Sequence, residues 1–291
     1  MKYIFLILLV IFLGCKKDIN VETTQPEIVE NLRLPAAAHP DHIIFVWLEN
    51  RGYNKIIGNS DAPYINSLIS KGTLFTNMYA TTHPSYPNYI SFFAGQNFNI
   101  TSSTCINGTP FSTSNLYTAL KKVNKTFAWY SEDLPSTGSR VCSSGYYREK
   151  HNPVTIFANV PSAQNKMFSS FPTDYTKLEN VVCITPNMMH DMHDGTTAAG
   201  DAWVKRHLST LAEWCRTHNS VFVVYFDEAG RTEDNNRIPV IAIGEHVKAN
   251  YKSGTRIDHY NWTHTICSMF YAPNRWTMNL NSRLNISDCW N

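Results

Sequence analysis

The sequence predicts an α/β fold of three layers (α/β/α), in which a mostly parallel central sheet lies between two layers of helices. Apolar runs of strand length, such as IIFVWL at residues 43–48 and VFVVYF at residues 221–226, alternate along the chain with segments of helical periodicity. Continuously apolar strands are typical of parallel sheets, because helices cover both faces of such sheets. The alternation of strand and helix therefore indicates βα units around one sheet.

Each element is predicted from its local pattern. Short apolar runs rich in β-branched and aromatic residues indicate strands, and apolar side chains spaced three and four apart indicate helices. Pro87 suits a helix start, because proline is tolerated in the first turn. In chain order, the strands are expected at residues 43–48, 73–79, 126–130, 181–185, 221–226 and 238–243. The helices are expected at residues 62–70, 87–93, 116–123, 198–216 and 259–270, with a polar loop at residues 96–113.

The N-terminus has the pattern of an export signal. Lys2 precedes an apolar run at residues 4–13, which is too short to span a bilayer as a helix. The sequence FLGC at residues 12–15 resembles a lipobox, which predicts a lipoprotein signal peptide at residues 1–14 and lipidation of Cys15. The alternative is an ordinary cleaved signal with a chance cysteine. We expect an exported lipoprotein, anchored to a bacterial membrane through Cys15 and facing the periplasm or the cell surface.

The mature chain divides into a tether and one domain. Residues 15–38 are polar and suit a tether, while residues 39–291 are long enough for one catalytic domain with a large core. Without Lys2, 24 of the 25 basic residues remain against 23 acidic residues, a balance of +1. No basic run stands out, so a nucleic-acid partner is not expected. The sequence leaves the oligomeric state open.

Seven cysteines are an odd number, and assigning Cys15 to lipid leaves six. In an oxidising compartment, an even set of cysteines indicates disulfide bonds. The predicted pairs are Cys105–Cys142 and Cys267–Cys289, with Cys183–Cys215 as the remainder. A buried free thiol is the alternative for Cys183, which lies in an apolar strand.

Acidic side chains follow the two strongest strands. Glu49 and Asn50 come directly after residues 43–48, and Asp227 and Glu228 come directly after residues 221–226. Ligands of parallel α/β sheets bind at the carboxyl ends of the strands, and hard divalent cations prefer oxygen ligands. These four residues therefore predict a divalent metal site, whereas the alternative is that each pair begins a solvated loop.

A candidate nucleophile lies in the sequence THPSYPNY at residues 82–89. Ser85 precedes the helix expected from Pro87, where backbone N–H groups and the helix dipole favour a phosphate. A metal beside Ser85 would favour its alkoxide form. The alternative is an N-cap serine in a proline-rich turn.

These motifs together resemble the bacterial phosphoesterase family of acid phosphatases and phospholipases C, which is similar in fold to alkaline phosphatase. The resemblance runs from about residue 42 to residue 270. It includes further motifs at residues 150–153 (KHNP), 186–194 (PNMMHDMHD), 200–203 (GDAW) and 258–260 (DHY). Some members carry Asp-Asp where this chain has Asp227 and Glu228, so the ligand role of Glu228 is less firmly implied.

The resemblance implies roles for individual residues. Ser85 is the expected nucleophile, and His151 and His193 are the expected catalytic histidines. The residues expected to bind substrate are His83, Asn88 and Asp191, and the residues expected to bind metal are Glu49, Asn50, Asp227 and Glu228. Each histidine has the alternative of a purely structural hydrogen bond.

The expected activity is metal-dependent hydrolysis of phosphate monoesters through a phosphoserine intermediate. The cofactor is a divalent metal ion of unspecified identity and number. The expected substrate is a small phosphorylated molecule or a phospholipid head group. A phospholipase C-type phosphodiesterase is the first alternative, and a non-catalytic lipoprotein that binds phosphorylated ligands is the second.

Overall fold

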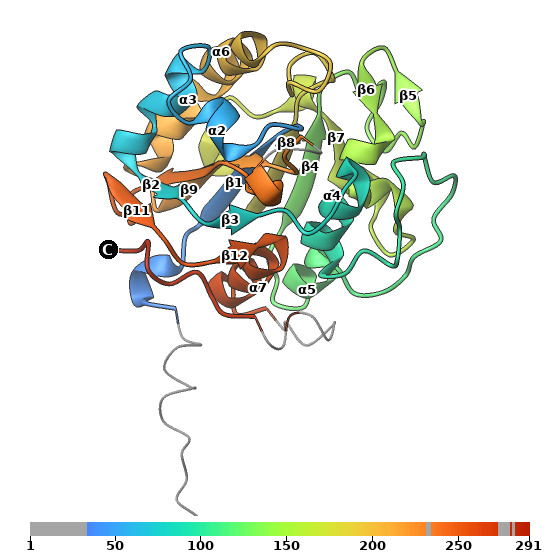
Figure 1. Ribbon diagram of the computed structural model, residues 1–291. Helices are drawn as coiled ribbons and strands as arrows, with labels where there is room; N and C mark the ends of the chain where they lie inside the picture. The colour runs from blue at the N-terminus through green and yellow to red at the C-terminus, as the bar shows by residue number, and fades with distance from the viewer. Residues whose placement is uncertain (1–33, 231–233, 273–279, 281–282) are drawn as a thin grey trace, which may run out of the picture.

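The computed structural model describes residues 34–230, 234–272, 280 and 283–291. Within these residues, the largest sheet has eight strands in the order β11-β2-β10-β9-β1-β8-β4-β7 (Figure 1). Neighbouring strands are parallel, except that β10 is antiparallel to β9 and β2. The predicted mostly parallel sheet is therefore confirmed. Its strands are β1 (His42–Leu48), β2 (Thr73–Phe75), β4 (Phe127–Ser131), β7 (Asn165–Met167), β8 (Val181–Thr185), β9 (Ser220–Phe226), β10 (Val240–Gly244) and β11 (Tyr251–Ser253).

Helices cover both faces of this sheet. Phe45 packs edge-on against Phe92 and Trp262, whereas the ring of His42, three residues earlier and on the opposite face, lies 5.9 Å from the ring of Trp214. The first face is covered by α4 (Ser85–Ala94), α5 (Leu116–Lys121) and α7 (His259–Met269). The second is covered by α3 (Pro63–Ser67) and α6 (Thr197–Cys215), while α2 (Tyr53–Ile56) lies in the loop after β1.

Aromatic side chains form the centre of the first interface. Trp47 stacks on Tyr89 of α4 with a centroid distance of 4.5 Å and packs edge-on against Phe92 and Tyr225. Aromatic pairs of this kind contribute about 0.5–1.5 kcal/mol each beyond the area they bury. This packing fixes α4 against the strand that ends at Glu49.

The remaining elements are short. The two strands β3 (Met78–Tyr79) and β12 (Ile257–Asp258) form a small parallel sheet, and β5 (Ser143–Ser144) pairs with β6 (Tyr147–Arg148). The 3-10 turns are η1 (Ala36–Ala38), η2 (Ile69–Lys71), η3 (Glu149–His151), η4 (Pro153–Ile156), η5 (Ser162–Gln164), η6 (Phe168–Ser170), η7 (Tyr175–Lys177) and η8 (Asp234–Asn236).

Two predicted elements differ in detail. The strand expected at residues 73–79 is divided into β2 and β3, which belong to different sheets. The helix expected from Pro87 begins two residues earlier, at Ser85, so Ser85 is its first helical residue and not a residue that precedes it.

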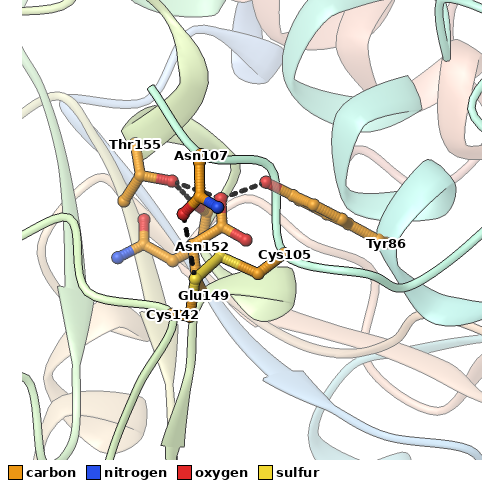
Figure 2. The surroundings of a disulfide bond; sticks show 7 residues. All are labelled: Tyr86, Cys105, Asn107, Cys142, Glu149, Asn152 and Thr155. Carbon is orange, nitrogen blue, oxygen red and sulfur yellow. Dashed lines mark hydrogen bonds between the residues drawn. A yellow bond between two sulfur atoms is a disulfide. The ribbon is translucent and has the colours of Figure 1, made fainter. Parts of the chain in front are cut away.

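One predicted disulfide is confirmed. Cys105 and Cys142 are bonded, and the bond joins the polar loop at residues 96–113 to the segment before β5 (Figure 2).

The other two predicted disulfides are wrong, because all four cysteines are buried free thiols. Cys183 is in register with Phe45 and so faces the side of the sheet covered by α4, whereas Cys215 belongs to α6 on the opposite side. The Cys267 carbonyl accepts the N–H of Ala272 at the end of α7. The carbonyl of Cys289 accepts a hydrogen bond from a different segment, the N–H of Lys248.

The predicted signal peptide at residues 1–14, the lipidated Cys15 and most of the tether lie outside the described residues. The chain enters the described part at Leu34 and passes through η1 to the amino end of β1. Among the described residues, no helix is both long enough and apolar enough to cross a membrane.

Candidate active site

The acidic residues predicted to bind metal converge where β1 and β9 end. Leu48 is in register with Phe226, so the residues that follow each strand lie side by side. The Asp227 N–H donates to the Leu48 carbonyl at 3.1 Å, and the Asn50 N–H donates to Asp227 Oδ1 at 3.0 Å. Glu49 and Asp227 are fully buried and Glu228 is nearly so.

Ser85 lies at this same edge of the sheet. Its Oγ is 2.8 Å from Glu49 Oε2 and 3.1 Å from Glu228 Oε1, as a hydroxyl donor between two carboxylate acceptors. Because Ser85 is the first residue of a ten-residue helix, it lies at the positive end of the helix dipole. The other Glu228 oxygen lies 2.5 Å from Nδ1 of His83, so His83 is also at this edge.

Asn88 supports the loop that carries Ser85. Its Oδ1 accepts the N–H groups of Thr81 and Thr82, both at 3.1 Å, and its Nδ2 donates to the Thr82 carbonyl at 2.9 Å. The side chain is fully buried. The structure thus places Asn88, which was expected to bind substrate, behind the loop, where it holds the residues before Ser85.

His151 lies between two buried carboxylates on the other side of Glu49. Its Nε2 is 3.1 Å from Glu49 Oε1, and its Nδ1 is 3.1 Å from Asp191 Oδ2. Neither contact has the alignment of a hydrogen bond, since His151 Nε2 and Asp191 Oδ2 have no hydrogen-bond partner in the described part of the chain. Burial, with the nearby charges of Lys150 and His193, holds the pKa of His151 well below its usual range, which favours the neutral ring.

The surroundings of Asp191 make it an orienting residue. It is fully buried, its carbonyl accepts the Glu49 N–H at 2.7 Å, and its Oδ1 accepts the His193 N–H at 2.8 Å. Burial and the charge of Glu49 raise the pKa of its carboxyl well above the usual range. Asp191 was expected to bind substrate, but the structure places it against His151.

His193 is the more accessible of the two expected catalytic histidines, with about a quarter of its side chain exposed. Its Nε2 is 3.0 Å from the ammonium of Lys150 and its Nδ1 is 2.8 Å from Asp194 Oδ1. An ammonium can only donate, so Nε2 accepts and the ring proton is on Nδ1, where it is donated to Asp194. Lys150 therefore fixes the tautomer of His193.

The donor set at this edge suits a hard divalent cation. Burial and the charges of Glu49 and Glu228 raise the pKa of Asp227 well above its usual range. Asp227 Oδ2 is buried without a hydrogen-bond partner in the described part of the chain. Adjacent carboxylates that share buried space require a compensating cation or proton, and oxygen ligands favour a divalent ion.

No three His, Cys, Asp or Glu side chains among the described residues are already arranged as a ligand shell. Oxygens of Glu49 and Glu228 are instead held by Ser85, Tyr89 and His83. The residues therefore fit a metal in their chemistry, and their side chains would exchange these hydrogen bonds for metal contacts.

Sequence reasoning assigned no role to several supporting side chains. Tyr89 donates from its hydroxyl to Glu49 Oε1 at 2.5 Å and stacks on His151 with a centroid distance of 5.3 Å. Tyr86, next to Ser85, donates to Glu149, and Thr155 donates to the same carboxylate oxygen at 2.9 Å (Figure 2). Both tyrosines lie within residues 82–89, but only the three-dimensional structure reveals their partners.

His259 and Asp201, which belong to the other motifs, have structural roles. The His259 ring lies between the Asp227 carbonyl and the Tyr225 hydroxyl, at 2.7 Å from each, and burial lowers its pKa to about 4. Asp201 accepts the N–H groups of Tyr64 and Ile65 at the start of α3.

Comparisons with known proteins agree with this geometry. Residues 59–273 match the model of the Phosphoesterase family, a span that includes Ser85 and Asp227 but begins after Glu49. The chain is 42% identical over 250 residues to the phosphatidylinositol-3-phosphatase of Mycobacterium tuberculosis, covering 84% of this chain and 82% of that one. It is 30% identical over 257 residues to an acid phosphatase of Aspergillus fumigatus, covering 81% of this chain and 56% of that one.

Solved structures show the same fold at low sequence identity. A protein of the alkaline phosphatase superfamily from Vibrio parahaemolyticus has a TM-score of 0.57 at 13% identity, over 84% of this chain and 69% of that one. The lipoteichoic acid synthase LtaP from Listeria monocytogenes has a TM-score of 0.59 at 12% identity, over 87% of this chain and 80% of that one. The chain therefore belongs to the Phosphoesterase family, and it is a phosphoric ester hydrolase with the fold of the alkaline phosphatase superfamily.

Proposed function

We propose that this protein hydrolyses phosphate monoesters through a phosphoserine formed on Ser85, with the help of a divalent metal ion. The observation that carries the proposal is the position of the Ser85 hydroxyl, at the first residue of α4 and 2.8 Å from Glu49. A serine that caps a helix accepts a backbone N–H, whereas Ser85 follows the N-cap residue Pro84 and its hydroxyl donates to Glu49 and Glu228. A hydroxyl that donates to carboxylates is prepared to lose its proton.

Glu49, Asn50, Asp227 and Glu228 are the residues that would hold the metal. When bound, a divalent ion would neutralise phosphoryl oxygens and lower the pKa of the serine hydroxyl. Without a cation, the carboxylates around Ser85 would repel a phosphate, since two unit charges 4 Å apart interact by about 4 kcal/mol at a typical effective dielectric constant.

The side chains around this edge supply the remaining chemistry. The Ser85 Oγ–P bond forms as the bond between phosphorus and the ester oxygen breaks, and water then attacks the phosphoserine and releases phosphate. Glu49 is placed to accept the hydroxyl proton, and the start of α4 stabilises negative charge on the phosphoryl group. We propose that His193, which is about a quarter exposed and lies next to the Lys150 ammonium, donates a proton to the leaving oxygen.

Phosphate monoesters are the preferred substrate class. The relative at 42% identity is named a phosphatidylinositol-3-phosphatase, and the relative at 30% identity is named an acid phosphatase. Both names describe hydrolysis of a phosphate monoester. We propose a phosphorylated small molecule or head group as the substrate, with phospholipase C-type diester hydrolysis as the outcome to be tested against it.

We further propose that the protein is an exported lipoprotein anchored through Cys15. The described chain enters at the amino end of β1, whereas Ser85 and the acidic residues lie at the carboxyl ends of β1 and β9. The seven residues of β1 separate these ends by roughly 23 Å. The active site therefore lies at the end of the sheet opposite to the end where the described chain enters β1.

The test is phosphate release from an aryl phosphate, with bis-aryl phosphate and phosphatidylcholine as the diester comparison. We expect turnover of the monoester that falls by about 10³-fold or more in Ser85→Ala. Thr81→Ala and Thr82→Ala, which remove the neighbouring hydroxyls, should retain turnover. Preferential hydrolysis of the diesters, or near-normal turnover by Ser85→Ala, would contradict the proposal.

A further inference from the structure

A polar pocket opens beside the loop that leads to Ser85. It has a volume of about 340 Å³, within the range of about 300–1,000 Å³ that is usual for small-molecule sites. It lies where β3, β12 and the start of α7 meet. Its lining includes Thr81, Tyr79, Arg256, Asp258, Tyr260 and Arg283.

The charge of this pocket is positive. Arg283 Nη1 pairs with Asp258 Oδ2 at 2.6 Å, and Asp258 Oδ1 caps α7, so the charge of Arg283 is largely balanced. Arg256 has no carboxylate partner among the described residues. Its guanidinium carbon instead lies 3.9 Å from the centroid of the Tyr79 ring, a cation–π contact between two residues that line the pocket. The pocket thus presents one uncommitted guanidinium, a group suited to phosphate.

Hydrogen bonds connect the pocket to the helix of the nucleophile. The Tyr260 hydroxyl is 3.2 Å from Ser91 Oγ on α4, and the Thr81 hydroxyl donates to Asn88 Oδ1 at 2.9 Å. Thr81 both lines the pocket and precedes Ser85 by four residues, so their Cα atoms are at most about 14 Å apart. Ser85 and the pocket therefore lie on one loop, at a separation comparable to the length of a substrate of moderate size.

We propose that this pocket binds a second anionic group of the substrate, a phosphate or a phosphodiester, while the phosphate to be hydrolysed lies at Ser85. The inference rests on the proposed function and narrows its substrate class to molecules with two anionic groups. Arg256 is the specificity-determining residue, because it supplies the unpaired positive charge. Arg283 and Tyr260 complete the wall of the pocket.

Three inositol phosphates test this assignment. Inositol 3-phosphate carries only the monoester, inositol 1,3-bisphosphate adds a free phosphate, and glycerophosphoinositol 3-phosphate adds the phosphodiester of a lipid head group. KM and kcat are measured for each with wild type, Arg256→Met, Arg256→Lys and the control Arg216→Met, which removes an arginine paired with Glu213 at the end of α6. Binding of each compound to Ser85→Ala protein, with and without Arg256→Met, is measured by calorimetry.

We expect wild type to have a KM about tenfold lower for at least one compound with two anionic groups than for inositol 3-phosphate, the factor that corresponds to about 1.4 kcal/mol. Arg256→Met should remove this preference with kcat and the KM for an aryl phosphate unchanged, Arg256→Lys should restore part of it, and Arg216→Met should have no effect. A preference for the bisphosphate alone identifies a free phosphate as the ligand, and a preference for the diester identifies a head group.

An absent preference, or an equal rise in KM for all substrates in Arg256→Met, would overturn the proposal. If neither wild type nor any arginine variant turns over a phosphate ester, the proposed function fails. Calorimetry with Ser85→Ala protein then still decides whether the pocket binds the second anion.

Discussion

Ser85 and Glu49, which are 36 residues apart in the sequence, form a buried hydrogen bond of 2.8 Å from the serine hydroxyl to the carboxylate. The bond exists because α4 packs through Tyr89 and Phe92 against Trp47, two residues before Glu49. The aromatic core thereby sets the distance between the nucleophile and the first acidic residue.

Asp227→Asn should abolish most activity and leave the fold intact. The amide keeps an oxygen acceptor for the Asn50 N–H but removes one buried negative charge. In metal-free protein, the loss of repulsion from Glu49 should keep or raise the free energy of unfolding. The measurement is turnover and melting temperature with chelator and with added divalent ions, and Asp174→Asn, at an exposed carboxylate that caps η7, is the control. Stabilisation of Asp227→Asn by divalent ions to the same extent as wild type would count against the metal site.

Lys150→Met should lower kcat/KM for an aryl phosphate by about 10- to 100-fold, because it removes a charged hydrogen bond of about 1.5–3 kcal/mol beside the site. It also frees His193 to adopt the other tautomer. Lys150→Arg should recover part of the activity. Lys166→Met, which removes a lysine paired with Glu179 away from the site, is the matched control. Equal effects of Lys150→Met and Lys166→Met would show that Lys150 has no special role.

Glu149→Gln should change how stability depends on pH. Burial raises the pKa of Glu149 above its usual value of 4.5, so the folded state binds this proton more tightly than the unfolded state. Stability from this group is fully present below pH 4.5 and is lost as pH rises through the folded pKa. Relative to Glu149→Gln, wild type should therefore become less stable between pH 4.5 and neutral pH. Urea unfolding at several pH values measures this, and a difference in stability that stays constant with pH would contradict the assignment.

Loss of the disulfide between Cys105 and Cys142 should destabilise the protein and reduce activity moderately. Closing a loop with a sequence separation of 37 contributes about 4 kcal/mol in the chain-entropy model. The loop it holds places Ser103 Oγ as acceptor for the Tyr86 N–H, next to Ser85. Unfolding and turnover of the Cys105→Ala/Cys142→Ala variant measure both effects.

The four free thiols should react with a thiol reagent only after unfolding, because all of them are buried: Cys183, Cys215, Cys267 and Cys289. Rapid reaction in native protein would contradict the thiol assignment.

The convergence of Glu49 with Asp227 was predictable, because strand-end residues of neighbouring parallel strands meet at one edge of the sheet. Ser85 was predictable from its place before a helix, although the helix begins at Ser85 itself. The resemblance to a known family supplied His151 and His193. These features depend on local pattern, on strand order or on motifs that the sequence displays directly.

The remaining features depend on long-range geometry that local pattern does not contain. Lys150 contacts His193, which lies 43 residues later in the sequence, and Glu149 contacts Tyr86, which lies 63 residues earlier, so both contacts depend on how distant segments fold together. The pairing of Cys183 with Cys215 was wrong because strand alternation places the first thiol on the face opposite α6. Strands of two residues, such as β3 and β12, carry too little pattern to be recognised.

The proposed mechanism requires Ser85 to become phosphorylated during turnover. The direct measurement is acid quenching during steady-state hydrolysis of an aryl phosphate, followed by mass spectrometry of the peptide that contains Ser85. We expect one added phosphoryl group on Ser85 in wild type with divalent metal, and none in Ser85→Ala or in chelated protein. Phosphorylation of another residue would contradict the proposed mechanism. Turnover without any phosphorylated peptide, under conditions in which hydrolysis of a phosphoserine would be rate-limiting, would also contradict it.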